Sequence, residues 1–86
     1  MTQGAFIEFI HDNDCEYDKD GNFYRVWRRT DRRLRSLMPI KNRDHKMRSV
    51  TICNICQDLN IAHPPELDQA AAILRQIKES IKKQQI

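Results

Sequence analysis

Apolar and polar residues in the N-terminal third of this chain recur in patterns that predict a β-hairpin. Residues 5–10 (AFIEFI) are rich in aromatic and β-branched side chains, which favour a strand. Residues 22–29 (NFYRVWRR) alternate between two faces, as expected of a second strand. Asp20-Gly21 signals a turn before this strand, because glycine adopts positive φ at no steric cost. We therefore expect an antiparallel hairpin, with a short extra strand around residues 15–17 as a further option.

The middle of the chain predicts a short helix followed by a basic loop. Thr30 or Asp31 can cap a helix that runs to Met38. Pro39 ends this helix, because the residue before a proline avoids helical angles. The inward-facing residues of the helix would be Leu34, Leu37 and Met38. Residues 40–48 follow as a loop that carries several cations.

Two segments of the C-terminal half fit helices. Residues 50–61 fit a helix with one apolar face, although their first residues also fit an alternating strand, and the helix is preferred. The apolar face would consist of Ile52, Ile55, Cys56 and Leu59. Residues 65–84 predict the clearest helix, because Pro65 suits the first turn and Glu66 suits the positive end of the helix dipole. Its apolar residues cover an arc of about 160° at helical spacing. They are Leu67, Ala70, Ala71, Ile73, Leu74, Ile77 and Ile81.

These elements predict a single α+β domain over residues 1–86. An N-terminal antiparallel β-hairpin is followed by two or three helices, and the C-terminal helix is long and amphipathic. The 86 residues are 40% hydrophobic and 31% charged, which is typical of a soluble globular domain. No stretch approaches the roughly 20 apolar residues of a membrane span, and no secretory signal is recognisable, so we expect no membrane contact. Three cysteines, an odd number, do not indicate a disulfide framework. We expect reduced thiols and a cytoplasmic protein, or a nuclear one in a eukaryotic cell.

The charge of the chain is sorted into three blocks. Residues 25–48 carry ten Lys and Arg side chains against two Asp, a net charge of +8. Residues 1–24 carry −5 and residues 49–86 are neutral, which leaves +3 for the whole chain. Arg outnumbers Lys by eight to two in the basic block. Because the arginine fork offers several donors to one oxyanion, this block predicts contact with nucleic acid or with an acidic protein surface.

The basic block supplies the candidate binding residues, together with two aromatic side chains that can stack on unpaired bases. These residues are Arg25, Arg28, Arg29, Arg32, Arg33, Arg35, Lys41, Arg43, Lys46, Arg48, Tyr24 and Trp27.

A structural interpretation competes with this one. The acidic block can pair with the first three arginines across the hairpin, as opposite charges often do on neighbouring strands. The acids would be Asp12, Asp14 and Glu16, and the cations Arg25, Arg28 and Arg29. Trp27 equally suits a core position in a domain that is short of large apolar groups. Even so, a second set of cations would be left without partners. These are Arg32, Arg33, Arg35, Lys41, Arg43, Lys46 and Arg48.

Metal and catalytic patterns are weak in this sequence. Cys53 and Cys56 have the C-x-x-C spacing of a zinc-ligand pair. Further ligands would have to come from the scattered residues His11, His45, His63 and Cys15. Apolar neighbours of the pair favour two buried cysteines instead, so we expect no metal and no cofactor. We find no convincing catalytic constellation and no Gly-rich phosphate loop, and we expect no enzymatic activity.

The leading interpretation is a small non-catalytic binding module. It would contact nucleic acid, either DNA or RNA, through the Arg-rich segment and mainly at phosphates. The alternative is a small regulator or inhibitor that docks on a larger protein or ribonucleoprotein complex through the same block or through acidic residues 12–20. A homodimer through the Ile73 and Ile77 edge of the C-terminal helix is a further expectation.

Overall fold

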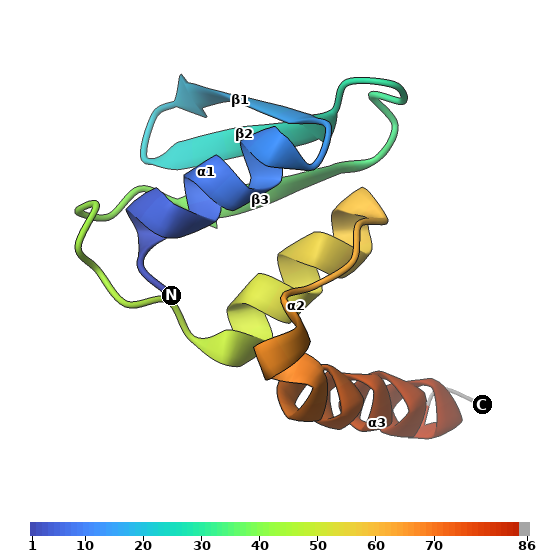
Figure 1. The fold of residues 1–86 in the computed structure, drawn as a ribbon. Coiled ribbons are helices and arrows are strands. Elements are labelled where there is room, and N and C mark those ends of the chain that lie inside the picture. Colours follow the sequence, from blue (N-terminus) through green and yellow to red (C-terminus); the bar gives the residue numbers. More distant parts are fainter. Residues whose placement is uncertain (85–86) are drawn as a thin grey trace.

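Three antiparallel strands form one sheet in the computed structural model, which describes residues 1–84 (Figure 1). The elements in chain order are α1 (Gln3–Asp12), β1 (Cys15–Asp20), β2 (Phe23–Arg28), β3 (Arg35–Pro39), α2 (Ser49–Leu59), the 3₁₀ turn η1 (Pro65–Leu67) and α3 (Asp68–Gln84). The strand order is β1-β2-β3, so β2 is central and β1 never meets β3. The predicted α+β class is confirmed, but the hairpin is not N-terminal, because α1 precedes it.

The segment expected to be the first strand, residues 5–10, is part of helix α1. Its apolar residues include the pairs 6/9, 7/10 and 6/10, which lie three or four residues apart, the spacing of a helix face rather than of a strand. Phe6 and Ile10 are both fully buried on that face. The Thr2 hydroxyl caps the helix by accepting a hydrogen bond from the Ala5 N–H at 3.2 Å. Helical periodicity and a cap therefore outweigh the strand propensity of the sequence.

The hairpin is formed by β1 and β2 around Gly21. Gly21 has φ +62°, the conformation that the predicted turn required. The register pairs Cys15 with Arg28 at one end and Asp20 with Phe23 at the other. The optional strand around residues 15–17 is thus the start of a full partner for β2.

The third strand replaces the short helix that was expected to end at Met38. β3 pairs with β2, with Trp27 opposite Arg35 and Tyr24 opposite Met38. Its residues alternate between faces, because Met38 is buried whereas Leu37 is 60% exposed. The capping signal was misleading, because the β2 backbone supplies hydrogen bonds that no local sequence pattern reveals. The predicted helix is therefore wrong, and the strand that replaces it includes Pro39 as its last residue.

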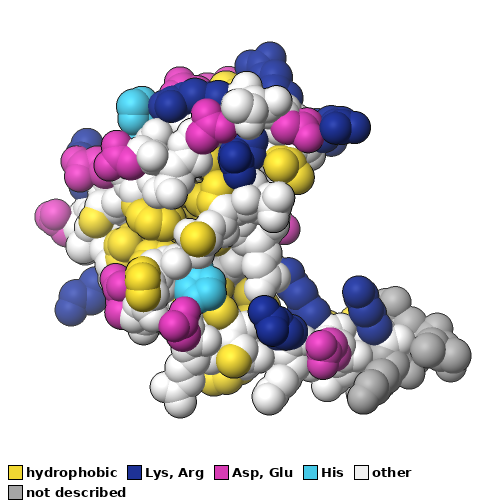
Figure 2. Space-filling view, turned by 45° about the vertical axis from the view of Figure 1, so that its right-hand side comes forward, with side chains coloured by type: hydrophobic (Ala, Val, Ile, Leu, Met, Phe, Trp, Pro, Cys, Tyr) yellow, Lys and Arg dark blue, Asp and Glu magenta, His cyan; other side chains and the backbone are white. Residues whose placement is uncertain are grey.

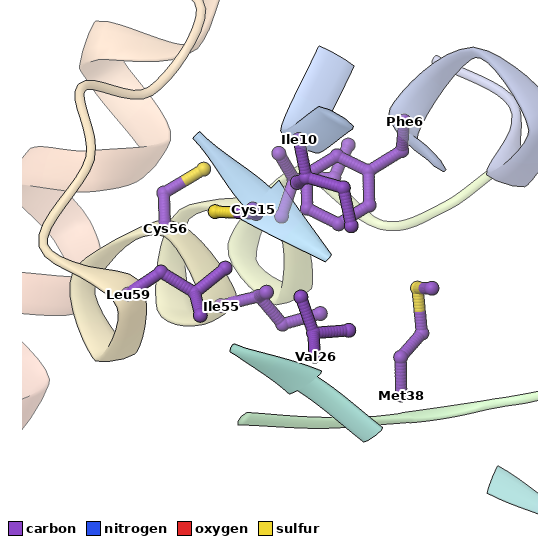
Figure 3. Close-up of a cluster of buried hydrophobic side chains, with 9 residues drawn as sticks. Phe6, Ile10, Cys15, Val26, Met38, Ile55, Cys56 and Leu59 are labelled. Atoms are coloured by element: carbon purple, nitrogen blue, oxygen red, sulfur yellow. The ribbon is translucent and has the colours of Figure 1, made fainter. Parts of the chain in front are cut away.

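The main core lies between the sheet and two helices (Figure 3). Helix α1 contributes Phe6 and Ile10, and the sheet contributes one buried residue from each strand. The strand residues are Cys15, Val26 and Met38, and the α2 residues are Ile52, Ile55, Cys56 and Leu59. Both helices therefore pack on the same face of the sheet. The opposite face, which we call the outer face, carries Phe23, Arg25, Trp27 and Leu37.

The two C-terminal helices confirm the predictions for residues 50–61 and 65–84. α2 ends at Asn60, which adopts the left-handed conformation with φ +55°. α3 begins after the 3₁₀ turn and packs on α2 through Ala71 and Leu74, which cover Cys53. The rest of α3 projects from the body of the domain (Figure 2). The predicted apolar arc is therefore only partly core, because its outer edge is about half exposed. That edge consists of Ile73, Ile77 and Ile81.

Candidate nucleic-acid interface

The arginines of the hairpin are held by carboxylates of β1. Arg25 donates to both carboxylate oxygens of Asp18, from Nε and Nη2, at 2.9 Å each. Arg29, just after β2, lies 2.7 Å from a Glu16 oxygen through its Nη2. The antiparallel register creates this arrangement, because it places the acidic β1 residues beside the basic β2 residues. Arg29 thus pairs with one of the acids that the structural interpretation of the sequence named. Arg25 also pairs with an acid of β1, but with Asp18, which that interpretation did not name.

Arg28 is a structural residue rather than a free cation. It lies on the inner face, and its side chain is 21% exposed. Its Nη1 donates to the carbonyl oxygens of Leu59 at 3.1 Å and Asn60 at 2.9 Å. Its Nε and Nη2 each lie 3.5 Å from Asp14 Oδ2. Arg28 therefore joins the end of α2 to the start of the hairpin, and its predicted role in binding is not supported by its position.

The two aromatic candidates lie on opposite faces of the sheet. Tyr24 faces inward, half-buried against the main core, and its ring meets Tyr17 edge-on at 5.6 Å between centroids. Trp27 faces outward and belongs to neither buried cluster, so the core position considered for it is not observed. The Arg32 guanidinium lies over its indole, 5.0 Å from the ring centroid. Of these two candidates, only Trp27 therefore remains available for stacking on a ligand.

The outer face is hollowed beside this tryptophan. An open groove of about 790 Å³ runs between β2, β3 and the connection that joins them. Its lining includes Trp27, Leu37 and three arginines, of which Arg25 is already paired with Asp18. The other two arginines are Arg32 and Arg35.

The seven basic residues between positions 32 and 48 are all exposed, and we call them the exposed cations. Three lie at the β2–β3 connection and the start of β3, and are the turn cations Arg32, Arg33 and Arg35. Four lie on the 40–48 loop, and are the loop cations Lys41, Arg43, Lys46 and Arg48. The sequence predicted that this set would lack acidic partners, and the structure corrects that for two of its members.

Those two members form solvent-exposed pairs. Arg33 Nε lies 3.0 Å from Asp31 Oδ1, with the Arg33 side chain 91% exposed. The hydrogen bonds from the Arg33 side chain and backbone hold the pKa of Asp31 below its usual value. Arg43 Nη2 lies 3.7 Å from a Glu8 oxygen, and both side chains are largely exposed. Within residues 1–84, no carboxylate lies within 4 Å of the other five cations.

The loop that carries the loop cations is fixed to the N-terminal end of α1. The Gln3 side chain is buried, donates to the Pro39 carbonyl at 2.9 Å and accepts from the Lys41 N–H at 2.8 Å. The Gln3 and Gly4 N–H groups donate to carbonyls of the loop, those of His45 and Arg43. A Cβ at position 4 would lie 3.3 Å from the backbone and side chain of Arg43, so glycine permits this approach. Sequence reasoning missed Gln3, because nothing in a lone glutamine at the start of a helix signals a partner 38 residues away.

The three cysteines are free and buried, and they do not converge on one site. Cys56 lies in the main core with Cys15, whereas Cys53 faces α3 and lies 3.7 Å from the Leu67 carbonyl oxygen. Burial raises the pKa of Cys56 to about 12, which keeps its thiol protonated. Within the described part of the chain, no three His, Cys, Asp or Glu side chains form a group that could hold a metal ion.

Comparison with known protein families, with curated proteins and with solved structures finds no match for this chain. None of the helices formed by residues 1–84 is both long and apolar enough to cross a membrane.

Proposed function

We propose that this chain is a small non-catalytic binding module that contacts nucleic acid through its exposed cations. The observation that carries the proposal is the division of the basic block. Arg25, Arg28 and Arg29 are engaged by acidic residues of the hairpin or by the end of α2, whereas all seven basic residues from Arg32 to Arg48 are exposed. A surface that only needed charge for solubility would not require arginine, which is the side chain suited to phosphate.

The two groups of cations are spaced in a way that fits a phosphate backbone. The turn cations and the loop cations lie at opposite ends of β3, a five-residue strand. A strand of that length spans roughly 15 Å. Phosphates along one strand of a duplex repeat about every 3.4 Å, so both groups can contact one backbone a few nucleotides apart.

Preorganisation of the loop supports the same proposal. Long cationic side chains lose conformational entropy on binding, and a mobile loop adds the cost of ordering the backbone. Here the backbone of the 40–48 loop is already held by Gln3, Gly4 and Thr2, the last through a bridge to Lys46. The loop cations are thus presented from a fixed backbone while their side chains stay exposed.

Paired charge reversals test the proposal. Lys41→Glu with Lys46→Glu removes two loop cations, and Arg75→Glu with Lys82→Glu makes the same change in net charge on the exposed surface of α3. We expect the first pair to weaken binding to labelled DNA and RNA duplexes by about tenfold or more at low salt, and the second pair to have a much smaller effect. Fluorescence anisotropy provides the affinities, and circular dichroism verifies folding. Equal losses for both pairs would contradict a localised interface.

A different result of the binding experiment would favour the alternative function. Failure of the wild-type protein to bind any nucleic acid at low salt would favour the alternative, a regulator that docks on an acidic surface of a larger protein.

The predicted homodimer through Ile73 and Ile77 stays a prediction. It is supported by the 47% exposure of both side chains and can be tested by sedimentation velocity. We also propose a cytoplasmic location, or a nuclear one in a eukaryote, on the basis of the three free cysteines.

A further inference from the structure

The outer face of the sheet holds an arrangement that phosphate binding does not explain. Trp27 is the only tryptophan of the chain, and it lies in the open groove rather than in the core. The Arg32 guanidinium lies over its ring, and Arg35 is its direct neighbour on β3. From these observations we infer that the groove binds an unpaired nucleotide of a single-stranded nucleic acid, with its base stacked on Trp27. The inference rests on the proposed function and specifies which form of nucleic acid this face recognises.

The contact between Arg32 and Trp27 shows that the indole face accepts a planar group. Arg32 is exposed and has no carboxylate within 4 Å among the described residues, so its guanidinium interacts with the indole of Trp27 instead. A cation–π contact at an exposed site is weak, and a base can displace the guanidinium or insert beneath it. In either case Arg32 stays close enough to stack on the outer surface of the base or to contact its phosphate.

The carboxylates near the tryptophan do not oppose a phosphate there. Glu16 lies opposite Trp27 on β1, and its carboxylate is bound by Arg29 at 2.7 Å. Asp18 also lines the groove, and both of its oxygens accept hydrogen bonds from Arg25. On the other side, β3 offers only Arg35, Ser36 and Leu37 to the groove. The nucleotide strand would therefore follow the β3 side, between the turn cations and the loop cations.

An acidic peptide fits this groove less well than a base does. Its carboxylates could pair with Arg32 and Arg35, but they would not use Trp27, because the face of an aromatic ring is electronegative. A duplex fits less well too, since its bases are already stacked on one another and cannot lie on the indole. The combination of one half-buried indole, which lines the groove, with two arginines that have no carboxylate partner thus favours an unpaired nucleotide.

Tryptophan fluorescence of the full chain tests the inference directly, because Trp27 is the only indole. The probes are a short single-stranded RNA, the same sequence as a duplex, and a polyglutamate peptide. We expect the single strand to quench Trp27 fluorescence strongly at saturation and the duplex to quench it weakly. Absence of quenching by a bound single strand would overturn the inference without requiring any variant.

Two variants at one position separate stacking from charge. Trp27→Leu should weaken single-strand binding by about 5- to 100-fold, the equivalent of one lost base–aromatic stack, and leave duplex affinity within about twofold. Trp27→Phe keeps a flat ring and should recover most of the affinity. Circular dichroism confirms that both variants fold.

The remaining outcomes distinguish this inference from the proposed function. If neither the single strand nor the duplex binds the wild-type protein, the inference and the proposed function both fail. If both bind and Trp27→Leu weakens neither, the proposed function stands and the stacking site is overturned. Stronger quenching by polyglutamate than by the single strand would also overturn it, in favour of an acidic peptide on this face.

Discussion

Two neighbouring groups of arginines differ in what surrounds them. The first group lies on β2 and directly after it, and the second lies at the β2–β3 connection and the start of β3. Arg25 and Arg29 meet the carboxylates of β1. Arg32 and Arg35 meet no carboxylate within 4 Å in the described part of the chain. The cause is the strand order, because β2 separates the acidic strand β1 from β3, whose sequence RSLMP holds no acid. The acidic residues of β1 therefore pair with β2 and the residue after it but do not reach β3, and the overall charge of the chain does not show which cations stay available.

The largest effect on stability is expected at Arg28, the arginine whose side chain has the most partners inside the protein. Arg28→Ala removes the donor to the carbonyls of Leu59 and Asn60 and leaves Asp14 without its partly buried cation. We expect the free energy of unfolding to fall by about 3 kcal/mol, since hydrogen bonds to charged groups contribute roughly 1.5–3 kcal/mol each. Urea denaturation followed by circular dichroism measures this loss.

Arg35→Ala is the matched control for that experiment, because Arg35 is an exposed arginine of the neighbouring strand. Its effect on the free energy of unfolding should stay within about 0.5 kcal/mol. Equal destabilisation by the two substitutions would contradict the division into structural and available arginines.

Binding measurements on the turn cations test the same difference between paired and available arginines. Reversing Arg32, Arg33 and Arg35 to Glu should leave the midpoint of urea unfolding nearly unchanged, because solvated charges contribute little to stability. The same change should weaken duplex binding by about 10- to 100-fold at low salt. It should also make the negative slope of log K against log salt shallower by about 0.9 for each lost contact. Anisotropy titrations over a range of salt concentrations measure both quantities. Unfolding of the triple variant would show that these arginines are structural after all.

A smaller effect is expected for the exposed pair of Arg25 and Asp18. Asp18→Asn removes the charge of the partner but keeps its shape, so the melting temperature should fall by much less than in Arg28→Ala. The difference from the wild type should vanish at high salt, because exposed pairs are screened. A difference that persists in high salt would indicate that the hairpin needs this ion pair for more than charge.

The smallest expected effect concerns the pKa of Asp31. In the folded protein this pKa lies below its usual value because Arg33 donates hydrogen bonds to the carboxylate. The pair therefore stabilises the fold above the unfolded pKa, and this stabilisation disappears as the pH falls through the folded pKa. In Arg33→Ala, an NMR titration should show the Asp31 pKa moved upward toward its usual value. An unchanged pKa would mean that another group holds the carboxylate.

Local sequence signals predicted some elements well and others poorly. The Gly21 turn, β2 and the two C-terminal helices were predicted because each has a periodic pattern or a strong local signal. Residues 5–10 were assigned wrongly because their aromatic and β-branched content hid a helical spacing. β3 was missed because a strand of five residues depends on its neighbour rather than on its own sequence.

The candidate site shows the same limit. The exposure of the seven cations followed from their excess over nearby acids, and the structure agrees with it. The hydrogen bonds of Arg28 to the end of α2 and those of Gln3 to Pro39 and Lys41 could not be predicted, because these partners lie more than 30 residues away and are brought close only by the complete fold.

The attachment of the 40–48 loop to the first residues of α1 also determines the order in which the domain can form. Met47 N–H donates to the Met1 carbonyl, so the segment before α1 closes onto a segment distant from it in the sequence. A ten-residue helix such as α1 is marginal alone, because isolated helices need about 12–15 residues. α1 and the 40–48 loop should therefore become ordered together, and such long-range closure slows folding. Hydrogen exchange in the native protein should then show the amides of Gln3, Gly4 and Met47 opening as one unit.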